Sequence, residues 1–159
     1  MTHNLHQLGD KKQRKQFQDL GEALKKYDKA KRQFLRLVNS SLASSEISLT
    51  VALLSIELGD NILAEEYFMQ SLKRGYTKPA QIYIYLSGIY DDRGDFEETL
   101  TWLKKIKSGK YFVDSRILMA EYIAKYDSVD SAIEMLDGLK KGHLSHDEKL
   151  IILRNKTSL

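Results

Sequence analysis

The chain has 159 residues, of which 42% are hydrophobic and 30% are charged. These proportions are typical of a globular domain with its own core, and they exclude a disordered or collagen-like chain. The absence of cysteine excludes disulfides, thiolate metal sites and a cysteine nucleophile. No apolar run reaches the ~18 residues that a membrane span needs.

The formal charge of +3 conceals a gradient along the chain. Residues 1–40 hold ten Lys or Arg against four Asp or Glu, whereas residues 41–159 hold fifteen against eighteen. The N-terminus lacks the apolar stretch of a secretory signal, so we expect a cytoplasmic location. We also expect residues 1–10 to be flexible and residues 11–159 to form one helical domain.

From residue 11 onward, a helical pattern recurs with a period near 34 residues. Small residues at one place in each repeat lie 34, 35 and 33 residues apart: Ala30, Ala64, Thr99 and Ala132. Four residues after each comes a large apolar residue on the same helix face: Phe34, Phe68, Leu103 and Leu136. Thirteen residues before each comes another: Phe17, Val51, Leu86 and Met119. This register predicts four helical hairpins, over about 11–44, 45–79, 80–112 and 113–142.

Turn signals separate the helices of the middle hairpins. Gly59-Asp60 and Gly94-Asp95 combine a glycine that ends one helix with an aspartate that begins the next. The first hairpin has Lys25-Lys26 at this place, so its two helices are expected to be nearly continuous.

A last helix is predicted over residues 145–157. Ser145 and Glu148 have the spacing of a capping box. Leu150, Ile151 and Leu153 are expected to form its apolar side, either as a cap on the fourth hairpin or as a dock for further repeats.

The period, the small residue where two helices cross and the Leu58-Gly59-Asp60 turn resemble the tetratricopeptide repeat over roughly residues 11–141. The resemblance implies an all-α fold, a right-handed solenoid of antiparallel hairpins closed by a C-terminal capping helix. The tryptophan that the family places early in each first helix is absent, and Ser48, Tyr83 and Arg116 hold the matching places.

In that family the first helices line a concave groove for peptides or partner helices. The resemblance therefore implies a partner-binding groove on three first helices: Leu49, Leu53, Ile56, Ile84, Tyr85, Gly88, Asp91, Asp92, Ile117 and Glu121. These residue types differ from the lysines and asparagines with which some members grip a C-terminal carboxylate. We expect an apolar groove with an acidic rim, suited to a peptide or amphipathic helix with apolar anchors and some positive charge.

Two features of this groove have a plainer interpretation. Its leucines and isoleucines could be core residues covered by neighbouring hairpins. Gly88 costs its helix about 1 kcal/mol relative to alanine, which favours a close approach either by neighbouring backbone or by a ligand.

Signals for chemistry are weak. The sequence has no phosphate-binding glycine loop, no Gly-x-Ser-x-Gly and no His-Glu-x-x-His. His143 and His146 supply too few ligands for a zinc site. We therefore expect no catalytic residues, no metal and no cofactor, and we predict a non-enzymatic chain.

The expected function is that of a protein–protein interaction module, a scaffold or adaptor. One alternative is a bacterial secretion chaperone, since such proteins resemble this chain in size and repeat number but are usually acidic. Another is a nucleic-acid-associated protein that uses a basic N-terminal hairpin: Lys25, Lys26, Lys29, Lys31, Arg32 and Arg36. Asp28 interrupts that stretch, so nucleic acid is not the expected partner, and a homodimer is left open.

Overall fold

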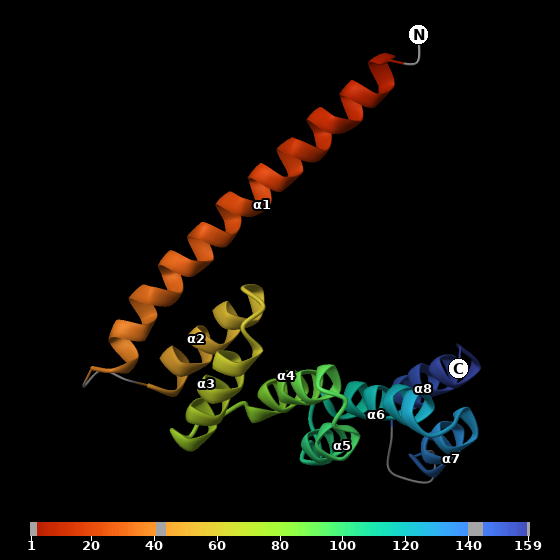
Figure 1. Ribbon diagram of the computed structural model, residues 1–159. Helices are drawn as coiled ribbons and strands as arrows, with labels where there is room; N and C mark the ends of the chain where they lie inside the picture. The colour runs from red at the N-terminus through yellow and green to blue at the C-terminus, as the bar shows by residue number, and fades with distance from the viewer. Residues whose placement is uncertain (1–2, 41–43, 140–144, 159) are drawn as a thin grey trace. The chain divides into compact units, whose positions relative to one another are not determined.

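The computed structural model describes residues 3–40, 44–139 and 145–158, and every regular element within them is an α-helix (Figure 1). The eight helices are α1 (His3–Val38), α2 (Ser45–Glu57), α3 (Asn61–Lys73), α4 (Pro79–Asp92), α5 (Phe96–Lys104), α6 (Phe112–Tyr126), α7 (Val129–Leu139) and α8 (His146–Ser158). They pack mostly as sequential antiparallel pairs, which confirms the all-α prediction.

The chain divides into two compact units, Met1–Tyr76 with α1–α3 and Thr77–Leu159 with α4–α8. A single superhelical domain over residues 11–159 stays a prediction. Residues 3–10 belong to α1, and the flexibility expected for residues 1–10 also stays a prediction. The expected end of the fourth hairpin, at residue 142, lies outside the described residues.

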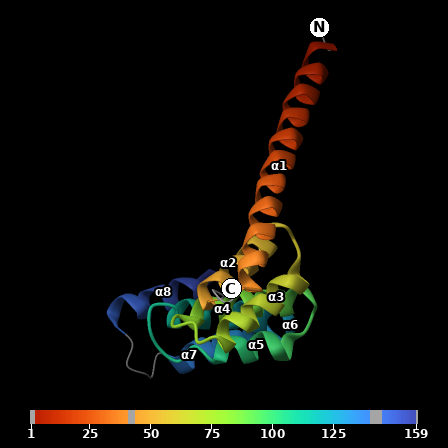
Figure 2. The ribbon, with the colours of Figure 1, turned by 90° about the vertical axis from the view of Figure 1, so that its left-hand side faces the viewer.

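In the first unit, α2 and α3 form a hairpin and run side by side in both views (Figures 1 and 2). Val51 of α2 and Ala64 and Phe68 of α3 are fully buried, as the repeat register predicts. The buried hydroxyl of Ser71 donates a hydrogen bond to the carbonyl of Ser45 at 2.7 Å, so this polar group is satisfied where it joins the two helices.

The turn between α2 and α3 forms because its sequence satisfies both helix ends. Gly59 has a φ of 72°, in the left-handed region that favours glycine. Its N–H donates to the carbonyl of Ile56 at 2.9 Å, and the N–H of Asp60 donates to that of Ser55 at 2.8 Å. The Asp60 carboxylate then accepts the N–H of Leu63 at 3.1 Å and caps α3.

The first predicted hairpin is absent, because residues 11–38 lie within the single helix α1. No glycine interrupts the helix at Lys25-Lys26, and α1 extends well past the α2–α3 hairpin (Figures 1 and 2). Only its C-terminal part joins the core of the unit, where Phe34 is half-buried and Val38 is buried. Phe17, which the register places in a hairpin core, is 75% exposed.

In the second unit, α4 pairs with α5 and α6 pairs with α7. The register residues predicted to be core are buried in both pairs: Leu86, Thr99 and Leu103 in the first, Met119, Ala132 and Leu136 in the second. Gly94, with a φ of 74°, and the cap Asp95 repeat the turn chemistry of the first unit between α4 and α5. The predicted turn signals therefore work alike in both units.

The last helix, α8, packs against α6 and α7. Its side chain in their core is Ile152, which is fully buried with Val113 and Leu136. The capping box is present: Ser145 N–H donates to the Glu148 carboxylate at 2.7 Å, and Glu148 N–H donates to Ser145 Oγ at 3.2 Å.

The apolar side that the sequence suggests for α8 is wrong. Leu150, Ile151 and Leu153 are 40–45% exposed, while the residue between the last two is buried. Only one side of α8 can face α6 and α7, because neighbouring residues point in different directions around a helix. In the structure Ile152 is on that side. The Lys156 ammonium adds an ion pair with Asp137 of α7 at 2.6 Å.

The buried contact of α8 can be tested with two adjacent isoleucines. Ile152→Ala should lower the free energy of unfolding by about 2–5 kcal/mol, because it leaves a cavity in the core. Ile151→Ala, at a 40% exposed position of the same helix, should cost less than about 1 kcal/mol. Urea denaturation followed by circular dichroism measures both. Equal losses would contradict this assignment of the buried face.

Candidate functional site

The predicted groove residues lie on three helices, in two units. Leu49, Leu53 and Ile56 are on α2 in the first unit. The second unit holds the rest: Ile84, Tyr85, Gly88, Asp91 and Asp92 on α4, and Ile117 and Glu121 on α6. None belongs to the buried cores; Asp92 and Glu121 are exposed and the others are half-buried.

On α4 the core residues and most of the predicted groove residues lie at different positions around the helix. The residues that pack into the core are spaced by four and three positions: Ile82, Leu86 and Ile89. Ile84 and Gly88 lie on another side of the helix, since each residue advances it by about 100°, and Tyr85 lies between that side and Ile89. Ile84 and Tyr85 are half-buried.

On α6 the separation is less complete. Ile117 is half-buried and packs against the core cluster of α6, α7 and α8. Glu121, one turn later, is exposed. Ile117 therefore contributes partly to the core, which is the plainer of its two interpretations. Glu121 lies at the surface.

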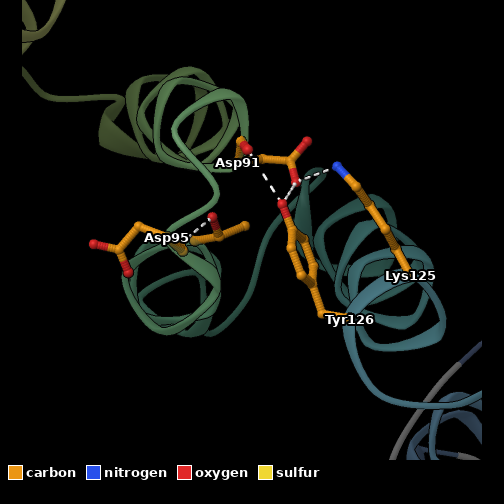
Figure 3. Close-up of polar contacts among 5 residues, drawn as sticks. Asp91, Asp95, Lys125 and Tyr126 are labelled. Atoms are coloured by element: carbon orange, nitrogen blue, oxygen red, sulfur yellow. Dashed lines mark hydrogen bonds and ion pairs between the residues drawn. The ribbon is translucent and has the colours of Figure 1, made fainter.

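Polar contacts join the outward sides of α4 and α6. The Asp91 carboxylate accepts hydrogen bonds at 2.8 Å from both the Lys125 ammonium and the Tyr126 hydroxyl (Figure 3). Both donors come from the last turn of α6, and the acceptor comes from the last turn of α4. The contact fixes these two first helices beside each other within the second unit.

This contact removes Asp91 from the acidic rim that the sequence predicts for the groove. Asp91 is largely covered and its charge is balanced by Lys125, so it acts inside the protein. Lys125 and Tyr126 were not among the predicted site residues. In the repeat register the place equal to Asp91 in the fourth repeat is Ala124, so Lys125 lies one residue beyond it and the register alone did not indicate the pair.

Gly88 lies between the apolar residues and Asp91 on α4. A Cβ atom added at Gly88 would meet nothing within 4 Å. Close approach by neighbouring backbone, one of the two explanations for this glycine, is therefore not observed. The open space is compatible with the second explanation, approach by a ligand.

The environment of α6 shifts the pKa values of two side chains beside Asp91. Burial raises the pKa of Tyr122, Asp91 raises it further, and a hydrogen bond with Ser87 partly opposes both. Hydrogen bonds with Asp91 and Tyr126 raise the pKa of Lys125. Both groups therefore hold their protons more tightly in the folded protein than in the unfolded chain.

Arg116 stands where a tetratricopeptide repeat would have its tryptophan, and it has a structural role. Its buried guanidinium donates to the carbonyls of Ile106 at 2.7 Å and Leu103 at 3.3 Å. These carbonyls lie at and just beyond the C-terminal end of α5, where positive charge is favourable. Burial lowers the pKa of Arg116 from its ordinary value.

Two basic residues of α1 form ion pairs with aspartates of the same unit. Arg32 forms an ion pair with Asp28 at 2.7 Å, and Lys31 lies 4.0 Å from Asp60. Lys25, Lys26, Lys29 and Arg36 are exposed. The stretch does not form one continuous basic surface.

The sequence matches no family in a scan of known protein families, and a search of curated proteins finds no match either. In the part of the chain that the structure describes, no helix is both long and apolar enough to cross a bilayer. Nor does that part group three His, Asp or Glu side chains where they could hold a metal ion. His143 lies outside the described residues.

The raised pKa values predict a loss of stability at alkaline pH. Below the ordinary pKa values of 10.0 for tyrosine and 10.5 for lysine, Tyr122 and Lys125 are protonated in both states, and their contribution to stability is complete. As the pH rises above these values, the unfolded chain loses protons first, so stability falls until the folded groups also titrate. Urea midpoints between about pH 8 and about pH 11 should fall less steeply for Tyr122→Phe/Lys125→Met than for the wild type. Parallel profiles would contradict the assignment.

Proposed function

We propose that this chain is a non-enzymatic protein-binding module, a right-handed solenoid of tetratricopeptide-type hairpins that holds a peptide or helix of a partner. The proposed binding residues lie on α2 in the first unit and on α4 and α6 in the second unit. The repeat register supports this reading, since the residues that it marks as core are buried in the pairs α2–α3, α4–α5 and α6–α7. Location in the cytoplasm stays a prediction.

Gly88 is the observation that carries the proposal. A glycine inside a helix costs roughly 0.5–1 kcal/mol relative to alanine. The structure offers no compensating contact, because the space beside Gly88 is open. The residue lies on the outward face, next to the half-buried Ile84 and Tyr85. A partner backbone that approaches α4 at this point would account for the loss of helix stability.

The chemistry of the face favours apolar anchors over charge. Ile84 and Tyr85 offer apolar surface, and the Asp91 carboxylate is already paired with Lys125. Glu121 of α6 is an exposed acid. The partner is thus a peptide or amphipathic helix that inserts apolar side chains and carries modest positive charge.

Substitution of Gly88 separates stability from binding. Gly88→Ala should raise the free energy of unfolding by about 0.5–1 kcal/mol, since the new methyl group meets no atom. Gly88→Leu should keep the helix but fill the open space beside residue 88. It should therefore weaken binding of a partner peptide at least about tenfold. The probes are peptides selected against the full chain from a random display library, with affinities measured by titration calorimetry.

Gly138→Leu is the matched control for this pair. Gly138 is also a helical glycine with open space around it, but it lies near the end of α7. The control should bind the selected peptides as the wild type does. Unchanged binding by Gly88→Leu would contradict the proposed surface.

Two acidic substitutions test the apolar faces. Leu53→Glu on α2 and Ile84→Glu on α4 should abolish binding of the selected peptides, because each puts a charge where an apolar anchor would lie. Both positions are half-buried, so helicity and the melting temperature should change little. If both variants unfold, the side chains are core and the surface is wrongly assigned.

A further inference from the structure

Helix α1 carries an apolar stripe that its own unit leaves bare. Phe17 is 75% exposed, Leu20 55%, Leu24 38% and Tyr27 37%. These residues are spaced by three, four and three positions, the a and d positions of a heptad repeat. The same stripe continues to Val38, which is buried in the unit. Its bare part is therefore the continuation of a packing face.

Three basic residues of this stretch lie on the other side of α1, while Lys31 lies in line with the stripe, 4.0 Å from Asp60. Lys25, Lys26 and Lys29 point away from the stripe, because successive residues turn by about 100°. A helix that lies on an anionic bilayer combines a broad apolar face with cations that reach the headgroups. Here the stripe is a narrow seam with the cations behind it. Such a seam fits another helix.

We propose that the stripe binds the same stripe of a second copy of this chain, with the two α1 helices antiparallel. An antiparallel pair centred on Glu22 sets Phe17 against Tyr27 of the second copy and Leu20 against Leu24 of the second copy. Every apolar side chain then meets an apolar side chain, and each contact occurs twice. This self-complementarity is what a two-fold interface requires.

The residues beside the stripe fit the same arrangement. Arg14 and Asp28 flank the stripe on the same side of α1, and in this register Arg14 lies within about 3 Å along the axis of Asp28 of the second copy. Opposite charges therefore meet at both ends of the contact, where Asp28 also pairs with Arg32 of its own chain at 2.7 Å. Near the centre, Gly21 and Ala23 each face their own counterparts. A Cβ added at Gly21 would meet nothing within 4 Å, so the space at the centre is open for a second helix. Small residues there let two helices approach closely.

A parallel pair also sets apolar residues against each other, but it does not bring opposite charges together. It would leave Arg14 about 21 Å along the axis from Asp28 of the second copy. The charge pattern therefore selects the antiparallel pair. The inference concerns α1 alone and does not rest on the function proposed for the faces of α2, α4 and α6.

Sedimentation equilibrium of the full chain tests the association. The wild type should show a concentration-dependent monomer–dimer equilibrium. Leu20→Asp/Leu24→Asp should raise the dissociation constant at least about tenfold, because it buries charge in the seam. Ile62→Asp, at a 79% exposed apolar position of α3, is the control and should leave it unchanged.

Exchange of charges tests the register. Arg14→Glu alone should weaken the dimer, since it sets two carboxylates against each other. Adding Asp28→Lys should restore the affinity, because the two charges are then exchanged. A double variant as weak as the single one would overturn the proposed pairing.

Spin labels test the direction of the helices. The chain lacks cysteine, so Lys11→Cys provides a unique labelling site. In the antiparallel pair the two labelled residues lie about 33 Å apart along the helix axis. In a parallel pair only the spacing between the axes, about 10 Å, would separate them. A short distance by pulsed electron paramagnetic resonance would overturn the antiparallel arrangement.

Other occupants of the stripe would give different results. A wild type that stays monomeric up to about 100 µM would overturn the proposal. If that monomer binds vesicles containing phosphatidylserine and Leu20→Asp/Leu24→Asp does not, the stripe binds a membrane. Circular dichroism confirms that each variant keeps the helicity of the wild type.

Discussion

Close packing within each helical pair is the constraint on which the structure depends, and small buried side chains permit it. The second helices of the pairs contribute Ala64, Thr99 and Ala132, all fully buried. Packed helices lie about 8–10 Å apart, and protein interiors leave few voids, so a larger side chain at these places would displace its neighbours. Each pair covers one side of its first helix, and Ile84 and Tyr85 of α4 are half-buried.

Polar contacts join α4 and α6 in the second unit. Asp91 joins Lys125 and Tyr126, and thereby holds the ends of α4 and α6 together. The acid that a partner might have used is satisfied within the chain. For the binding function that we propose, recognition on this face depends on shape and apolar contact around Gly88, with charge in a secondary role.

The same repeat pattern gives one long helix in α1 but helical pairs in the later repeats. Where Gly59 or Gly94 ends a helix, the chain turns back and the apolar side chains cover each other. Where Lys25 and Lys26 stand at the turn, the helix continues and carries Phe17 away from any hairpin partner. The bare stripe of α1 is a consequence of this missing turn, and it gives the chain a second surface on a different element.

The sequence by itself determined the helices, the turns and the core register of the later pairs, because periodicity, glycine turns and caps act over a few residues. Even there, tertiary packing chose Ile152 over its neighbours as the buried residue of α8, which the pattern of that short helix did not indicate. The role of the predicted groove residues stays a prediction, and Ile117 among them packs against the core of α6, α7 and α8. The pairing of Asp91 with Lys125 required the positions of two helices. Contacts between residues more than 30 apart depend on how helices stack. Stacking is set by the fit of whole faces, which no local pattern records.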